Sequence, residues 1–338
     1  MIPPRSLRAL MAMAMVLCLG GLAALAVACG GDDADALVDG GATARRIEPR
    51  SPLDGPYPQY QDGLNDLHTI LGTPDLGVGS QRVTFVLSDE TGLVRTPAVR
   101  VRTYFFADGP RGVAGEPLAD TLARFYEFPE GIRGLYSTTL EFDRSGTWGI
   151  EAGVAQPNGS LETTLFTFEV AQAPETPAVG ELAPRSHNRT SEDTPPEELT
   201  TGVDFDAGLY RLTIDDAIAL GRPTVVVFAS PGFCTNALCG PQVELVSALR
   251  TVYGPEASYV HVELYENPSE IRSGGLEVAR RTPVLEEWGL TSDEWTFILD
   301  GDGVVRARFE GFAPMAELVP AFEAVLAEAG ERAVSRVD

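Results

Sequence analysis

The chain has 338 residues, of which 25 are basic and 49 are acidic, so its formal net charge at pH 7 is −24. Every basic residue is an arginine. The absence of lysine excludes P-loop, pyridoxal-phosphate and protein-kinase chemistry, because each needs a lysine side chain. The acidic balance argues against binding to nucleic acid, which requires a basic surface opposite the phosphates. At roughly 100–200 residues per domain, the length allows about two domains.

The N-terminal residues predict export from the cytoplasm. Arg5 and Arg8 precede an uncharged apolar run at residues 9–28, and acidic residues follow it from Asp32. This charge asymmetry places the bulk of the chain outside the cytoplasm. The orientation is the same whether the run is a cleaved signal peptide or an anchor that spans the bilayer.

Residues 25–30, Leu-Ala-Val-Ala-Cys-Gly, resemble the lipobox of bacterial lipoproteins, in which small residues precede an acylated cysteine. The resemblance implies a signal peptide at residues 1–28, an acyl anchor on Cys29 and a mature protein held at the membrane surface. The leucine usual three places before the cysteine is replaced by Ala26, and an uncleaved signal anchor remains the alternative. With Cys18 removed and Cys29 acylated, Cys234 and Cys239 are left as a pair in an oxidising compartment.

The next part of the chain predicts a tether followed by an all-β domain. Residues 29–75 are rich in Gly, Asp and Pro, which predicts a flexible tether with one helical turn around residues 64–71. Residues 76–172 hold five segments of alternating apolar and polar residues, separated by turn residues. We expect an antiparallel β-sandwich, broadly immunoglobulin-like, with Trp148 and Phe168 in its core.

The second half predicts a linker and an α/β domain. Residues 173–204 are rich in Pro and acidic residues and predict a linker. From residue 205, a capping box at Thr213 predicts a helix, residues 223–229 predict a buried strand, and residues 240–252 predict a second helix. A strand at 259–265, a hairpin turning at 300–303 and a last helix from 314 follow. The fold class is therefore α+β with two domains, the second spanning residues 205–330, and residues 331–338 form a tail.

The element order around Phe233-Cys234-Thr-Asn-Ala-Leu-Cys239-Gly-Pro resembles the thioredoxin fold family. It also resembles bacterial envelope proteins with a sandwich before a thioredoxin-like domain and an FC-x4-CGP motif. The resemblance implies thiol–disulfide exchange with envelope proteins, without an organic cofactor. Cys239, at a helix start, is expected to attack, with Cys234 as its resolving partner. Gln242 stands where the family has its second cysteine.

Another departure concerns the segment that faces the cysteines in the family. The thioredoxin family has a cis-proline there, whereas residues 291–296 contain no proline. Asp293 and Glu294 lie in this segment, and close to the thiols they would raise a cysteine pKa and slow attack.

Two other interpretations of the cysteine pair stay open. The pair forms a structural disulfide in a non-catalytic binding or scaffold protein. Alternatively, the chain resembles Sco-like copper carriers, in which two thiolates and a histidine bind the metal. In that case Cys234 and Cys239 are the sulfur ligands, and His261 is the candidate third ligand.

Overall fold

The computed structural model describes residues 67–156, 159–234 and 239–335. The predicted signal peptide, Cys29 and most of the predicted tether lie outside these residues. Within the described part of the chain, no helix is both long enough and apolar enough to cross a membrane. The two sheets described below belong to one compact unit, residues 48–338.

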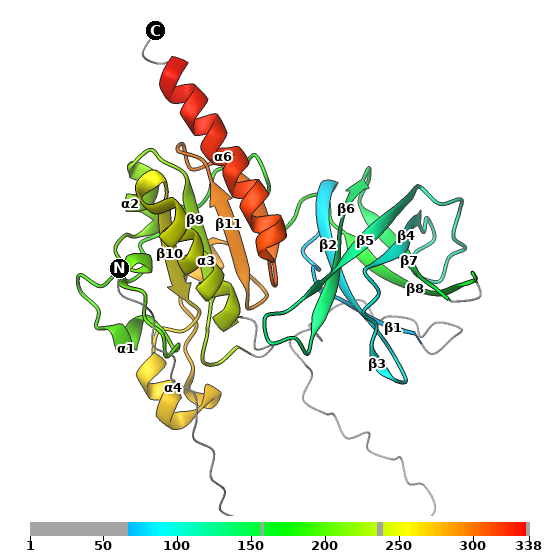
Figure 1. Cartoon of the computed structure of the whole chain (residues 1–338), viewed down its shortest axis with the longest axis horizontal. Coiled ribbons are helices and arrows are strands. Elements are labelled where there is room, and N and C mark those ends of the chain that lie inside the picture. Colours follow the sequence, from blue (N-terminus) through cyan, green and yellow to red (C-terminus); the bar gives the residue numbers. More distant parts are fainter. Residues whose placement is uncertain (1–66, 157–158, 235–238, 336–338) are drawn as a thin grey trace, which may run out of the picture. The chain divides into compact units, whose positions relative to one another are not determined.

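The first sheet is antiparallel and contains eight strands (Figure 1). Its order is β1-β2-β6-β5-β4-β7-β8, and β3 pairs with β2. A bridge between Gly77 and Ala171 brings the start of the sheet to its end, so the sheet curls into a near-barrel. The strands are β1 (His68–Leu71), β2 (Gly79–Asp89), β3 (Gly92–Leu93), β4 (Ala98–Phe105), β5 (Ala119–Glu127), β6 (Gly134–Phe142), β7 (Gly146–Ala155) and β8 (Leu161–Val170).

The antiparallel β domain predicted from the sequence is confirmed, and so is the burial of Trp148 and Phe168, each 1% exposed. The strands form one continuous sheet, whereas the spacing favoured two packed sheets. The predicted helical turn at 64–71 is wrong for its described part. Residues 68–71 form β1, because they pair with β2 and bury Thr69 and Leu71.

The second sheet has four strands in the order β10-β9-β11-β12. β9 and β10 are parallel and the other pairs are antiparallel. The strands are β9 (Thr224–Ala229), β10 (Ser258–Glu263), β11 (Trp295–Leu299) and β12 (Val305–Glu310). The helices are α1 (Pro196–Leu199), α2 (Ile214–Ala219), α3 (Cys239–Tyr253), α4 (Pro268–Gly274), α5 (Val284–Glu287) and α6 (Met315–Ser335), with short 3-10 helices at Ala207–Leu209, Gly254–Glu256 and Leu276–Val278.

Every residue of β9 is buried, because helices cover both faces of this sheet. Val225 and Val227 point to one face and pack with residues of α3 and α6. Val226 and Phe228 point to the other face and pack with residues of α2 and α5. The prediction of a mixed sheet covered by helices in this part of the chain is confirmed. Its predicted cap is present too, since the Thr213 side chain accepts a hydrogen bond from the Asp216 backbone N–H.

Residues 173–204 connect the two sheets, as predicted for a linker, but they also pack against the second sheet. Leu182 forms a bridge with Val304, and Ala183 N–H donates to the Gly303 carbonyl. Thr176, Ser186 and Asn188 are buried in this segment, among others. The composition predicted few buried residues, and small polar side chains with internal hydrogen bonds account for the difference.

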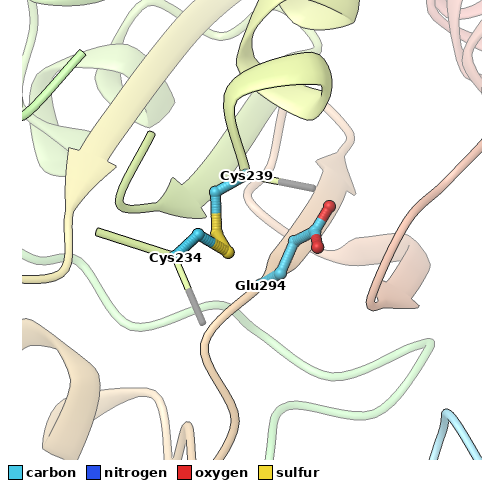
Figure 2. A group of neighbouring side chains, drawn as sticks. All are labelled: Cys234, Cys239 and Glu294. Atoms are coloured by element: carbon cyan, nitrogen blue, oxygen red, sulfur yellow. A yellow bond between two sulfur atoms is a disulfide. The ribbon is translucent and has the colours of Figure 1, made fainter. Parts of the chain in front are cut away.

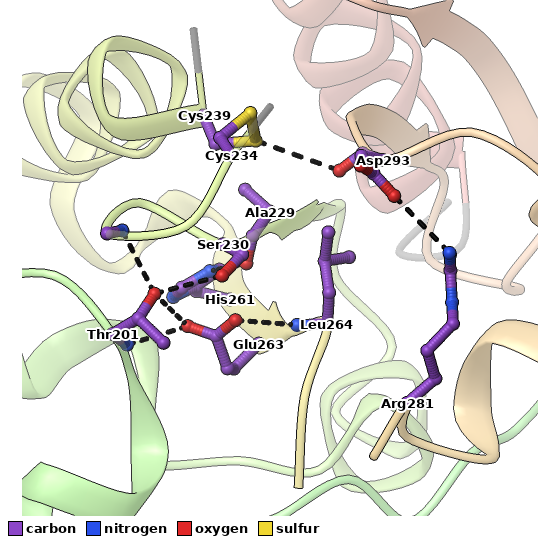
Figure 3. Close-up of a disulfide and its surroundings, with 11 residues drawn as sticks. Thr201, Ala229, Ser230, Cys234, Cys239, His261, Glu263, Leu264, Arg281 and Asp293 are labelled. Carbon is purple, nitrogen blue, oxygen red and sulfur yellow. Dashed lines mark hydrogen bonds and ion pairs between the residues drawn. A yellow bond between two sulfur atoms is a disulfide. The ribbon is translucent and has the colours of Figure 1, made fainter. Parts of the chain in front are cut away.

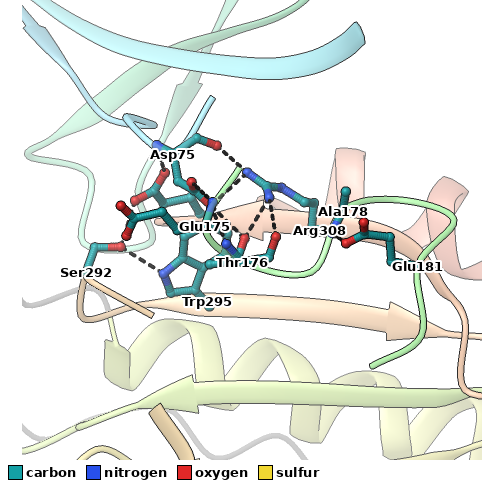
Figure 4. A network of polar contacts seen from close by, with 9 residues as sticks. Asp75, Glu175, Thr176, Ala178, Glu181, Ser292, Trp295 and Arg308 are labelled. Carbon is teal, nitrogen blue, oxygen red and sulfur yellow. Dashed lines mark hydrogen bonds and ion pairs between the residues drawn. The ribbon is translucent and has the colours of Figure 1, made fainter. Parts of the chain in front are cut away.

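Arg308 on β12 anchors both this connecting segment and the loop between β1 and β2 (Figure 4). Its guanidinium donates to Thr176 Oγ1 at 2.6 Å and lies 3.2 Å from an Asp75 carboxylate oxygen. The same Asp75 carboxylate accepts N–H groups of Glu175 and Thr176. Three separate parts of the chain therefore share one polar cluster.

Candidate functional site

The candidate site is the disulfide between Cys234 and Cys239 (Figure 2). β9 ends at Ala229, a loop carries Cys234, and Cys239 is the first residue of α3. The two Cα atoms are 5.8 Å apart, which is an ordinary separation for a disulfide. The pairing predicted from the sequence is confirmed.

The two sulfur-bearing residues differ in exposure. Cys239 is completely buried in the apolar cluster that includes residues of β9 and α3, whereas Cys234 is only partly buried. Cys239 Sγ lies 3.7 Å from the Asp293 carbonyl oxygen. A dashed line in Figure 3 marks this contact. The Asp293 carboxylate forms an ion pair with Arg281 at 3.3 Å. A reagent or another protein therefore reaches Cys234 before Cys239.

Two opposing electrostatic influences act on Cys239. As the first described residue of α3, it lies toward the N-terminal end of this helix, where the helix dipole stabilises a thiolate. The Asp293 carbonyl and the neighbouring carboxylate of Glu294 disfavour the same thiolate. The sequence predicted an acidic influence only if these two residues lie close to the thiols. The Glu294 carboxylate does lie beside the sulfurs, whereas Asp293 approaches Cys239 with its backbone carbonyl.

Glu294 lies beside the disulfide and is only 2% exposed (Figure 2). One carboxylate oxygen of Glu294 and the two sulfur atoms all lie within 4.8 Å of one another. Glu294 immediately precedes β11, whose first residue, Trp295, is paired with Phe228 of β9. The antiparallel pairing of β11 with β9 therefore carries Glu294 to the end of the sheet where the cysteine loop begins.

A buried polar network supports the loop that carries Cys234 (Figure 3). The Glu263 carboxylate accepts hydrogen bonds from Thr201 N–H at 2.7 Å, Thr201 Oγ1 at 2.8 Å and Leu264 N–H at 3.0 Å. Burial raises the pKa of Glu263 to about 7. Thr201 Oγ1 lies 3.0 Å from Ser230 Oγ and accepts the Gly232 N–H at 3.0 Å. Thr201 thus links Glu263 to the backbone just before Cys234.

His261 is part of the core and does not join the sulfurs. It is 1% exposed, and its Nε2 lies 3.0 Å from the Ala229 carbonyl oxygen. Because Nε2–H donates to that carbonyl, Nδ1 accepts the Tyr210 hydroxyl at 2.6 Å. Burial lowers the pKa of His261 to about 4, so the ring is neutral near pH 7. Both ring nitrogens of His261 therefore have partners in the core, and His261 is not among the described residues whose ligand atoms lie together with the two sulfurs.

Among the described residues, the group that places three ligand atoms together is Cys234, Cys239 and Glu294. Sequence reasoning recognised Glu294 only as a charge that would disturb the thiols. It did not identify the Thr201–Glu263 network, because Thr201 belongs to a segment expected to be a linker. A glutamate directly before a buried strand was the available indication of the Glu294 position.

No protein-family model matches the chain, and no curated protein matches it. Among solved structures, the chain is similar to the soluble domain of PmoD from Methylocystis sp. ATCC 49242 (Rockwell). The identity is 16% and the TM-score is 0.21, and the match covers 33% of this chain and 97% of that domain. A similarity of this size carries no information about the fold or function of this chain.

Proposed function

We propose that this protein exchanges disulfides with other proteins outside the cytoplasm, through Cys234 and Cys239 in a thioredoxin-like domain. The observation that carries the proposal is a disulfide that joins a partly exposed sulfur to the first residue of a helix. A helix N-terminus lowers the pKa of a thiol, and the thiolate is the form that enters disulfide exchange. The layered α/β arrangement around β9 supports a thioredoxin-like assignment.

The difference in exposure assigns a role to each sulfur. A thiolate of a partner protein attacks Cys234 Sγ, the Cys234–Cys239 bond breaks, and Cys239 leaves as a thiolate that then takes up a proton. A second thiol of the partner attacks the mixed disulfide, so the partner is oxidised to a disulfide and this chain gains two electrons and two protons. The reverse sequence reduces a partner disulfide. In this proposal Cys234 forms the bond to the partner, as the attacked sulfur in the first direction and as the attacking thiolate in the reverse one. Cys239 is the resolving residue, and these roles are the opposite of those expected from the sequence.

Attack at Cys234 also has the favourable leaving group. Exchange is faster when the departing thiol has the lower pKa, and Cys239 lies at the helix N-terminus. Glu294 and the Asp293 carbonyl oppose this effect. The helix and the acidic neighbours therefore set the reactivity of Cys239 together.

The proposed location follows from the N-terminal residues. A signal peptide at residues 1–28 and an acyl group on Cys29 would hold the domain at the outer side of a bacterial membrane. The partners would be thiols and disulfides of proteins in the same compartment. Cys29→Ser is expected to release the mature chain from membranes, and a processed Cys29→Ser chain that stays membrane-bound would contradict the anchor.

Single-cysteine variants and the redox potential test the proposed exchange. Cys239→Ser is expected to form a stable mixed disulfide with a small aromatic disulfide reagent, because Cys234 is reachable and its resolving partner is absent. Cys234→Ser is expected to react far more slowly, because Cys239 is buried. Equal rates for the two variants would contradict the assigned roles.

A structural disulfide is the second candidate, and the complete burial of Cys239 favours it. The reduction potential of the Cys234–Cys239 disulfide distinguishes the two functions. It is measured by equilibrating the protein with glutathione buffers in the presence of a metal chelator. A working exchange centre is expected well above about −300 mV, and a structural bridge below it. A value below that limit would refute the proposed function.

A further inference from the structure

We propose that the reduced form of this centre binds a zinc ion through Cys234 Sγ, Cys239 Sγ and a carboxylate oxygen of Glu294. The three ligand atoms already lie within 4.8 Å of one another. They come from three separate places in the chain, namely the loop after β9, the start of α3 and the residue before β11. The proposal uses the same sulfurs as the proposed exchange, but it requires only that the disulfide can be reduced.

The distances are close to those of a zinc site. Zinc binds cysteine sulfur at about 2.3 Å and carboxylate oxygen at about 2.0–2.2 Å, so two ligand atoms on one tetrahedral ion lie about 3.5–3.8 Å apart. The carboxylate has little distance to close, since its separation from the sulfurs is at most 4.8 Å. Once the S–S bond is broken, the sulfurs need to separate only to this spacing. The rest of the fold can stay as it is.

The reaction balances in two steps. A dithiol reductant donates two electrons and two protons to the disulfide, giving the thiols of Cys234 and Cys239 and oxidising the dithiol. Zinc then displaces both thiol protons and binds the two thiolates with the Glu294 carboxylate. The ligands carry three negative charges against two on the ion. The fourth tetrahedral position is left for water or a ligand from a partner.

The ligand set favours zinc over copper(I). Copper(I) is best matched by thiolate and thioether ligands, whereas zinc accepts cysteine sulfur together with a carboxylate oxygen. Glu294 is 2% exposed, so its carboxylate is already out of bulk water beside the sulfurs. The remaining negative charge of the complex lies at the N-terminus of α3, where the helix dipole stabilises it.

Zinc titration of the reduced full-length chain tests the proposal. A chain carrying Cys18→Ser and Cys29→Ser retains Cys234 and Cys239 as its only thiols. After reduction with a phosphine, it is titrated with zinc against a chromophoric chelator. We expect one tightly bound zinc per reduced chain and no tight binding by the oxidised chain. Cobalt(II) in place of zinc is expected to give thiolate-to-metal charge-transfer absorption.

Matched glutamate variants test the third ligand. Glu294→Gln is expected to weaken zinc binding at least about tenfold. Glu310→Gln is the control. Glu310 is also a buried glutamate, 5% exposed, and it is the β12 partner of Trp295, the residue that follows Glu294. It lies outside the group of ligand atoms. Its affinity for zinc is expected to equal that of the parent chain.

Three results would overturn the proposal. Equal binding by oxidised and reduced chains would assign the zinc to the acidic surface, and an unchanged affinity of Glu294→Gln would remove Glu294 as a ligand. X-ray absorption of the zinc-loaded parent chain counts the ligands without any glutamate substitution, and a shell without two sulfurs and at least one oxygen would also refute it. A potential below about −300 mV would end the proposed exchange but leave zinc binding by the forcibly reduced chain intact.

Discussion

Replacing Glu310 with glutamine is expected to stabilise the protein above neutral pH. Glu310 ends β12, is 5% exposed and accepts hydrogen bonds from the Asp75 N–H at 3.0 Å and the Ser292 hydroxyl at 2.7 Å. Burial raises the pKa of its carboxyl from 4.5 to about 7. Each unit of difference in pKa is worth about 1.4 kcal/mol, so the difference corresponds to about 3 kcal/mol at most.

The sign follows from which state holds the proton. Between about pH 4.5 and 7 the folded chain keeps the Glu310 proton and the unfolded chain has lost it, so stability falls as the pH rises through this range. Below about pH 4.5 both states are protonated, and the effect vanishes. Glutamine is neutral at every pH, and its oxygen can still accept the Asp75 N–H. The variant therefore avoids the cost of the buried charge.

Urea unfolding at a series of pH values measures this effect. The difference in unfolding free energy between Glu310→Gln and the parent chain is expected to be smallest near about pH 4.5. It should grow by up to about 3 kcal/mol in favour of the variant by about pH 8. Glu286→Gln, at an exposed position on α5, is the control for the substitution itself. A pH-independent difference for Glu310→Gln would refute the reasoning.

Two further predictions test the core of the second sheet. The ring resonances of His261 are expected to stay constant from about pH 8 to about pH 5, because burial lowers its pKa to about 4, and a midpoint near 6.5 would contradict its placement. Leu249→Ala on the buried face of α3 is expected to lower the unfolding free energy by about 2–5 kcal/mol. Val252→Ala, 71% exposed on the same helix, should change it by less than about 0.5 kcal/mol, and equal losses would contradict the helix orientation.

Local sequence patterns predicted the elements that carry their own periodicity or turn residues. The continuous apolar run of β9, the cap at Thr213 and the hairpin at Asp300–Gly303 were all assigned correctly. Pairing between strands that are distant in the chain could not be predicted from these local patterns. Residues 68–71 become a strand only because β2 offers a hydrogen-bonding edge, which no local pattern around them reveals.

The candidate site shows the same division. Elimination among four cysteines was enough to pair Cys234 with Cys239. His261 was predicted as the third ligand beside the two cysteines because of its residue type alone. In the structure, strand pairing brings Glu294 next to the sulfurs, and His261 bonds to the Ala229 carbonyl. The roles of the two sulfurs were predicted from the helix dipole alone, whereas the roles proposed above also use exposure, which depends on the surrounding packing.

The segment that connects the two sheets affects how readily one molecule associates with another through the edge of the second sheet. β12 is the last strand of its sheet, and an unpaired outer strand is a template for aggregation. Residues 180–183 occupy the beginning of that strand, since Gly180 N–H donates to the Val305 carbonyl and Val305 N–H donates to the Glu181 carbonyl. A stretch rich in proline and acidic residues thus shields this end of β12 from edge-to-edge addition.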